Sequence, residues 1–133
     1  MRVVLDTNVF VSGVFFSGPP YEILSAWRDR KFTLAFSSEI LDEYRKTGEK
    51  LARQFEGITL NPFLALVALH GELFASSVLD EAVCEDPEDD KFFACAITSD
   101  SRVIISGDKH LLKVSGYHGI EVLKPRAFVE NYL

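Results

Sequence analysis

The sequence has few residues that could cross-link the chain or bind a soft metal ion. It contains only two cysteines, Cys84 and Cys95, which form no CxxC or other zinc-ligand pattern. Its three histidines, His70, His110 and His118, also lack metal-ligand spacing. We therefore interpret both cysteines as buried free thiols in a reducing compartment, which disfavours a disulfide-stapled secreted domain and a zinc site.

Long hydrophobic runs are also missing. The longest apolar stretch, residues 63–69, is far too short to span a bilayer. Met1 and Arg2 lead directly into residues 3–5 and then Asp6, without the apolar region of a signal peptide. We expect a cytoplasmic protein without membrane contact. The 133 residues, 47% hydrophobic and 26% charged, are typical of one globular domain, which we expect to span residues 1–133.

A surplus of basic residues is missing too. The chain has 14 lysines and arginines against 20 acids, a net charge of −6, which taken alone argues against nucleic-acid binding. The acids are concentrated, however, because residues 80–90 contain seven acids and no base, while the remaining residues contain 13 acids and 14 bases. The acidity is therefore local, and it does not exclude an RNA substrate.

Short β-branched runs alternate with longer helical segments along the chain. Strands are predicted at residues 2–5, 33–36, 102–106 and 120–123, and a strand is favoured at 73–79. Helices are predicted at residues 21–30, 38–53, 87–99 and 109–113, with two more beginning near Asn61 and Pro125. Such alternation predicts an α/β protein, a three-layer α/β/α sandwich with a central, mainly parallel sheet.

Two acids follow directly after predicted strands. Asp6 directly follows the run at residues 2–5, and Asp108 follows the run at 102–106, which ends in Ser106, after the single residue Gly107. Because ligands of such sheets bind at the carboxyl ends of the strands, both side chains can face one crevice. A purely structural role stays open for each acid, since Asp6 could cap the next turn and Asp108 could cap the short helix after it.

Two further acids lie at the edges of predicted apolar helix faces. Glu43 is the acid closest to the apolar stripe of its helix, although an exposed pair with Lys46 is the structural alternative. Asp90 lies at the edge of the stripe that begins at Phe92, and it can point toward the crevice mouth. The neighbouring Asp86, Glu88 and Asp89 have ordinary explanations as a helix cap and first-turn acids.

Four carboxylates in one crevice cannot all stay ionised without a compensating charge. Hard divalent cations prefer oxygen ligands, so Mg²⁺ or Mn²⁺ suits this set better than zinc. No P-loop, GxGxxG motif or Ser-His-Asp arrangement offers another chemistry. A carboxylate-only metal site indicates phosphoryl transfer with water as the nucleophile.

Four motifs in order resemble the PIN domain family. They are Leu-Asp-Thr-Asn at residues 5–8, Ser-Glu-Ile-Leu-Asp-Glu-Tyr at 38–44, Asp-Pro-Glu-Asp-Asp-Lys-Phe-Phe-Ala-Cys-Ala at 86–96 and Ser-Gly-Asp-Lys-His-Leu-Leu at 106–112. The resemblance covers essentially the whole chain and is strongest to small stand-alone PIN proteins of the VapC-like toxin group. It implies a metal-dependent ribonuclease that cuts single-stranded RNA, leaves a 3′-hydroxyl and a 5′-phosphate, and forms a homodimer.

The resemblance also assigns site residues. The four acids of the family fall on Asp6, Glu43, Asp90 and Asp108. Secondary candidates follow from the same motifs: Asn8 to order the water shell of the metal, Ser106 in place of the more common threonine, and Asp86 and Asp89 as rivals of Asp90.

Other functions stay open at this point. A phosphatase with Asp6 as nucleophile would usually have a second Asp two residues on, where this chain has Asn8. A non-catalytic module that binds RNA or protein is the second alternative, and an RNA-processing nuclease without an antitoxin is the third. We expect an RNA substrate and, if the protein is a toxin, an antitoxin partner.

Overall fold

A computed structural model describes residues 1–75, 79 and 81–133. In this part of the chain, the strands are β1 (Arg2–Leu5), β2 (Thr33–Phe36), β3 (Glu72–Leu73), β4 (Val103–Ile105) and β5 (Glu121–Leu123). The helices are α1 (Thr7–Phe15), α2 (Pro19–Arg28), α3 (Ser38–Ala52), α4 (Asn61–His70), α5 (Asp90–Ser99), α6 (Lys109–Leu112) and α7 (Pro125–Tyr132), with 3-10 turns η1 (Pro87–Asp89) and η2 (Tyr117–Gly119). Within the described residues, no helix has the length and apolarity that crossing a bilayer requires.

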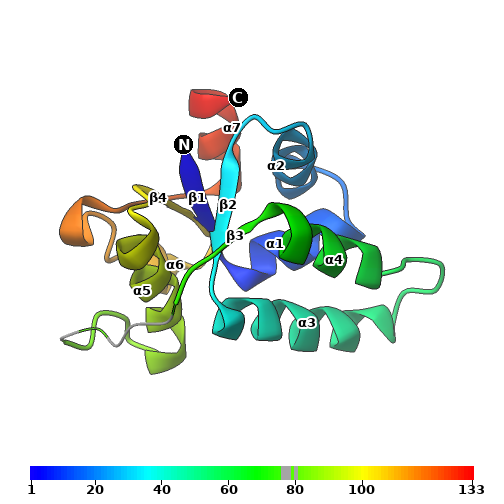
Figure 1. Cartoon of the computed structure of the whole chain (residues 1–133), viewed down its shortest axis with the longest axis horizontal. Coiled ribbons are helices and arrows are strands. Elements are labelled where there is room, and N and C mark those ends of the chain that lie inside the picture. The colour runs from blue at the N-terminus through cyan, green and yellow to red at the C-terminus, as the bar shows by residue number, and fades with distance from the viewer. Residues whose placement is uncertain (76–78, 80) are drawn as a thin grey trace.

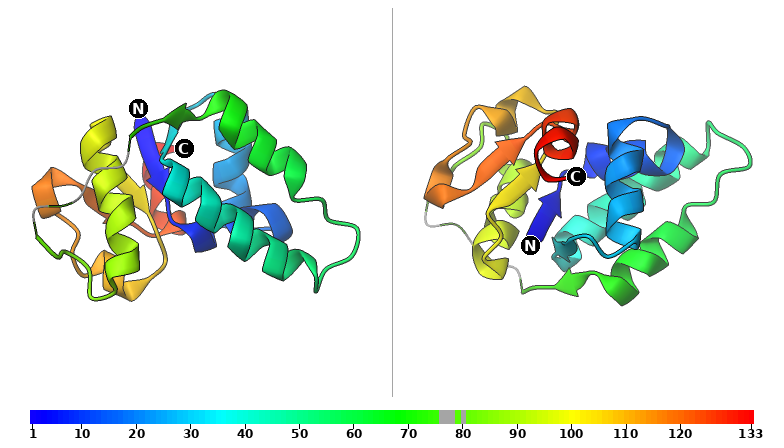
Figure 2. Two further views of the ribbon diagram at one scale, coloured as in Figure 1. Left: turned by 60° about the horizontal axis from the view of Figure 1, so that its bottom comes forward. Right: turned by 90° about the horizontal axis from the view of Figure 1, so that it is seen from above.

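All described strand pairs are parallel, and the strands lie in the order β3-β2-β1-β4-β5. Helices α1 to α4 lie on one side of the sheet and α5 on the other, while α7 packs against α2 (Figures 1 and 2). This is the predicted three-layer α/β/α sandwich. Strand order reverses between β1 and β4, because the chain adds β2 and β3 on one side of β1 and then crosses to β4 and β5 on the other. Ligands bind at such a switch point in parallel sheets.

The strands predicted at 2–5, 33–36, 102–106 and 120–123 are confirmed to within one residue at each end. The strand favoured at 73–79 is confirmed only as β3, Glu72–Leu73, and residues 76–78 of that prediction lie outside the described residues. Helix α1 was not predicted. Its sequence, Thr-Asn-Val-Phe-Val-Ser-Gly-Val-Phe, is rich in β-branched residues and is apolar on most sides, so it has no clear helical period.

Tyr44 joins the helical layer to the central strand. Its side chain is fully buried, it stacks on Phe10 of α1 with ring centroids 4.3 Å apart, and its hydroxyl donates a hydrogen bond of 2.6 Å to the carbonyl of Leu5. Leu5 is the last residue of β1 and directly precedes Asp6. The contact therefore fixes α3, and with it Glu43, relative to the end of β1.

Replacing Tyr44 with phenylalanine should test this anchor. Tyr44→Phe keeps the ring on Phe10 but removes the donor to the Leu5 carbonyl in a buried setting. We expect the free energy of unfolding to fall by about 1–2 kcal/mol, measured by urea denaturation. Tyr132→Phe is the control, because Tyr132 is 48% exposed, and it should leave the unfolding midpoint unchanged. Equal effects of the two changes would contradict an anchoring role for Tyr44.

Candidate active site

Asp6 lies at the centre of the candidate site. It follows β1, is 5% exposed, and its backbone N–H donates to the carbonyl of Ile105, the last residue of β4. It occupies the position before α1, but its side chain makes no capping hydrogen bond to that helix. The Ser106 hydroxyl donates to its Oδ2 instead, at 2.6 Å. Capping of α1 therefore does not account for the Asp6 side chain, which Ser106 holds at the switch point between β1 and β4.

Burial is the largest influence on Asp6. It raises the pKa of the carboxyl, and the charges of Asp108 and Glu43 raise it further, while the hydrogen bonds from Ser106 and the Thr7 backbone act against them. A buried carboxylate without a cation is costly to ionise. The protein thus leaves negative charge at this point only partly compensated.

Asp108 approaches the same place from the end of β4. Its Oδ1 accepts a hydrogen bond of 2.8 Å from the backbone N–H of His110, so it caps α6 as the structural alternative predicts. Its own backbone N–H donates to the hydroxyl of Ser106, which in turn donates to Asp6. Ser106 therefore links the two acids, and its hydroxyl is fully buried between them.

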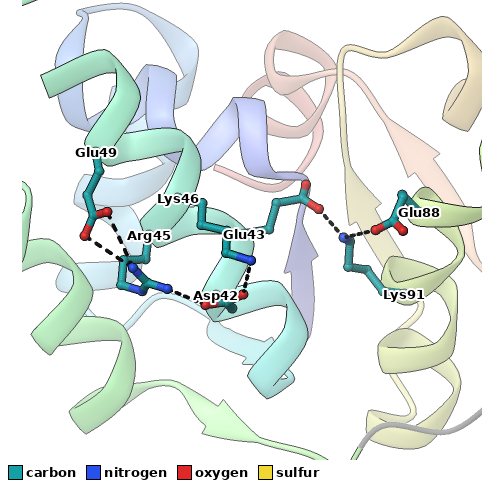
Figure 3. Close-up of polar contacts among 7 residues, drawn as sticks. All are labelled: Asp42, Glu43, Arg45, Lys46, Glu49, Glu88 and Lys91. Carbon is teal, nitrogen blue, oxygen red and sulfur yellow. Dashed lines mark hydrogen bonds and ion pairs between the residues drawn. The ribbon is translucent and has the colours of Figure 1, made fainter. Parts of the chain in front are cut away.

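Glu43 reaches the site from α3, and both of its carboxylate oxygens have a donor. The hydroxyl of Thr7 donates to Oε1 at 2.6 Å, and the ammonium of Lys91 forms an ion pair with Oε2. Figure 3 shows Lys91 extending from α5 to Glu43, with Glu88 as its second partner at 3.5 Å. The alternative pairing of Glu43 with Lys46 does not occur, because Lys46 pairs with Asp42 at 3.0 Å.

The structure separates the rivals Asp89 and Asp90. Asp90 accepts a hydrogen bond of 2.7 Å from the backbone N–H of Cys84 on Oδ1 and a longer one, 3.4 Å, from Val83 on Oδ2. Its carboxylate thus holds the preceding loop against the start of α5.

Asp89 has a different environment. Its side chain makes no capping hydrogen bond to α5. Burial raises its pKa to about 6, and the charges of Asp6, Asp86, Asp108 and Glu43 contribute to the shift. The charges of these four acids therefore act on the Asp89 carboxyl.

Two further candidates lie at the margin. Asp86 caps η1, since its Oδ1 accepts from the backbone N–H of Glu88 at 3.0 Å, which confirms the cap that the sequence predicts. Asn8 is exposed on the first turn of α1. Asp80, also part of the acidic run, lies outside the described residues.

The donor set of the site fits a hard divalent cation. Asp6, Asp89 and Asp108 carry carboxylate oxygens on three different elements, and the pKa values of Asp6 and Asp89 are raised first by burial and then by the charges of neighbouring acids. Among the described residues, no three acidic, histidine or cysteine side chains are close enough to hold an ion directly. A Mg²⁺ ion keeps several water ligands, so water-mediated contacts or small side-chain movements complete such a site.

Sequence reasoning missed Lys91 and the site role of Tyr44. Lys91 follows the acidic run by one residue, and its side chain is only 16% exposed because it crosses from α5 to Glu43. Its partner Glu43 is 48 positions away in the sequence, so no local sequence pattern predicts the ion pair. The Thr7 hydroxyl, which holds Glu43, comes from the residue directly after Asp6.

The sequence model of the PIN domain family matches residues 2–110, which include every acid described above. The chain therefore belongs to the PIN domain family. No curated protein matched the chain. PIN domains are generally nucleases that use divalent metal ions, and this supports a nuclease function for the chain.

The distinct roles of Asp89 and Asp90 predict opposite effects on stability in a metal-free buffer. The pKa of Asp89 is raised from 3.8 to about 6 in the folded protein, so the folded state binds this proton more tightly than the unfolded chain. Ionisation of Asp89 therefore lowers stability as pH rises through about 6. Asp89→Asn should raise the melting temperature at pH above this value, and the gain should vanish as pH falls toward 4.

Asp90→Ala is the matched change one residue on. It removes the acceptor for the N–H groups of Cys84 and Val83, and should lower the free energy of unfolding by about 1–3 kcal/mol at neutral pH. Thermal melts of both variants from pH 4 to 8 make the comparison. Destabilisation by Asp89→Asn at neutral pH would show that its carboxylate supports the fold instead.

Proposed function

We propose that this protein is an endoribonuclease that hydrolyses phosphodiester bonds of single-stranded RNA with the help of Mg²⁺ or Mn²⁺. The observation that carries the proposal is the buried carboxylate of Asp6 at the switch point of the sheet, which Ser106 links to Asp108 and whose pKa is raised by burial and by the charges of Asp108 and Glu43. A site with this excess of negative charge repels a phosphodiester unless a cation is present. Membership of the PIN domain family supports the same chemistry.

Asp6, Asp89 and Asp108 are the residues proposed to hold the ion, directly or through water. A divalent ion bound there would lower the pKa of a water molecule and offset the charge of the phosphate. Ser106 holds Oδ2 of Asp6 and the backbone N–H of Asp108, so it fixes the two acids relative to each other. Asp90, the third acid that the motif comparison favours, is proposed instead to position the loop before α5.

Glu43 is proposed to orient the attacking water. Thr7 and Lys91 fix the direction of its carboxylate, since each holds one of its two oxygens. An ionised carboxylate accepts a hydrogen bond from water and, as the water attacks, takes its proton. Direct metal binding by Glu43, as the motif comparison implies, remains part of the proposal if Lys91 moves away.

The biological role that we propose is that of a toxin, active as a homodimer in the cytoplasm and silenced by an antitoxin. Its support is the likeness to VapC-like proteins, while an RNA-processing role is the alternative. Expression in a bacterial host separates the two, because a toxin should arrest growth and a neighbouring small reading frame, co-expressed, should restore it. Growth without arrest would favour RNA processing.

Replacing Asp6 is the sharpest test of the proposed activity. Asp6→Asn keeps the size of the side chain and an acceptor for Ser106, but removes the charge. We expect RNA cleavage to fall at least about a hundredfold, and the rise in melting temperature on adding Mn²⁺ to disappear. Cleavage is measured on a single-stranded RNA by gel electrophoresis, with Mn²⁺ or a chelator present.

Asp42→Asn is the control for this substitution. Asp42 lies next to Glu43 on α3, but it pairs with Arg45 and Lys46 on the exposed side of that helix (Figure 3). It should cleave RNA and respond to Mn²⁺ like the unchanged protein. Full cleavage by Asp6→Asn, or equal cleavage with a chelator present, would refute the proposed function.

A further inference from the structure

A groove of about 450 Å³ lies between α1 and α3, beside the candidate site. Its lining combines apolar side chains with neutral hydrogen-bonding groups and one cation: Val11, Leu51, Asn8, Thr47, Gln54 and Lys50. Ligand sites commonly have this composition, an apolar surface with a few polar groups that fix orientation.

The groove begins where the site ends. Asn8 comes two residues after Asp6, and Thr47 comes one helical turn after Glu43 on α3. Residues four apart on a helix lie on the same face, so Glu43 and Thr47 are neighbours along α3. An RNA strand bound at the acids therefore reaches the groove without crossing the body of the protein.

The polar side chains of the groove have no partners within the part of the chain that the structure describes. Among the described residues, no side-chain hydrogen bond or ion pair is formed by any of Asn8, Thr47, Lys50 and Gln54. This contrasts with the rest of α3, where Arg45 and Lys46 are held by Asp42 and Glu49 (Figure 3). A nucleobase matches such a lining, because its faces are apolar and its edges form hydrogen bonds.

The distribution of charge favours one of two paths for an RNA strand that extends from the site. The other flank, formed by η1 and the start of α5, carries the acidic run that ends at Asp90. The groove has no acid among its lining residues, and Lys50 is its one cation. A negatively charged backbone is therefore repelled on the α5 side and attracted on the α1–α3 side.

We propose that the groove between α1 and α3 binds the nucleotide of single-stranded RNA that adjoins the cleaved bond. The base lies against Val11 and Leu51, its edge is read by Asn8, Thr47 and Gln54, and Lys50 contacts a phosphate. The inference rests on the proposed function, since it assigns the path of the substrate at the same site.

A second groove, lined by Arg28, Arg30 and His70 among others, lies between α2 and α4. It includes Thr33, the first residue of β2, and so opens at the amino ends of the strands. The candidate site is at the carboxyl ends. An RNA strand bound at the acids would have to pass around the sheet to reach this second groove.

Two charge reversals on one helix test the proposal. Lys50→Glu and Lys46→Glu change the net charge equally, but only Lys50 lines the groove. Both are made in the protein that keeps Asp6, and binding of a fluorescein-labelled single-stranded RNA is measured by anisotropy with Ca²⁺ in place of Mg²⁺, so that a divalent ion is available to the acids while cleavage is suppressed. We expect Lys50→Glu to weaken binding about tenfold and to reduce the slope of log affinity against log salt by about 0.7, the value of one phosphate contact. Lys46→Glu should change affinity by less than about twofold.

An uncharged change and a crosslink complete the test. Gln54→Ala should alter the base preference of binding without altering the salt slope. RNA carrying 4-thiouridine should crosslink to peptides that contain residues 8–12 or 47–54. Equal effects of the two lysine changes, or crosslinks confined to residues 27–33 and 66–72, would overturn the groove assignment.

The two proposals fail in different ways. If Lys50→Glu in the otherwise unchanged protein cleaves and binds RNA normally, the groove assignment is wrong and the nuclease stands. If the unchanged protein binds RNA in the groove but never cleaves it, the nuclease is wrong and the groove stands. If no RNA binds, both are wrong.

Discussion

The organisation of this protein depends on one constraint, the cost of placing the carboxylate of Asp6 almost out of solvent at the end of a fully apolar strand. The only side-chain hydrogen bond to it among the described residues comes from Ser106. Two more acids, Asp108 and Glu43, raise the pKa of Asp6 further by repulsion, and the charge of Asp6 in turn contributes to the raised pKa of Asp89. A fold that needed only stability would not place these charges together, and a bound cation is the compensation that fits their oxygen donors.

The parallel topology brings these residues together from distant parts of the chain. Asp6 and Ser106 are 100 positions apart and meet because β1 and β4 are neighbours at the switch point. Glu43 arrives from α3, on the face of the sheet that carries α1, and Asp89 from the other face. The pair of Glu43 and Lys91 joins the two helical layers directly across the end of the sheet. The site thus exists only in the folded chain, and the same contacts hold the layers in place.

The sequence predicts the strands well because each is a short, almost continuously apolar run, and such runs are typical of a parallel sheet covered on both faces. It does not predict α1, whose β-branched residues and weak periodicity hide a helix stabilised by packing on α2 and α3. That Asp6 and Asp108 lie near each other can be predicted from the topology alone, because both follow the carboxyl ends of parallel strands. The choice between Asp89 and Asp90 cannot, because consecutive residues at a helix start diverge by about 100° and the turn η1 changes their direction.

Neighbouring acids in this site have different roles, because some hold the backbone in place and others contribute negative charge at the site. Asp90 fixes a loop, whereas the pKa of Asp89 is raised by burial and by the charges of other acids. Asp108 does both, since its cap of α6 sets the direction of a carboxylate that also acts on Asp6. The central claim is that the charge at Asp6 is completed by a divalent ion. A crystal structure with Mn²⁺, located by anomalous scattering, measures this directly. The account predicts an ion among Asp6, Asp89 and Asp108. An ion bound only by Asp90 and the preceding loop, or none at this end of the sheet, would contradict it.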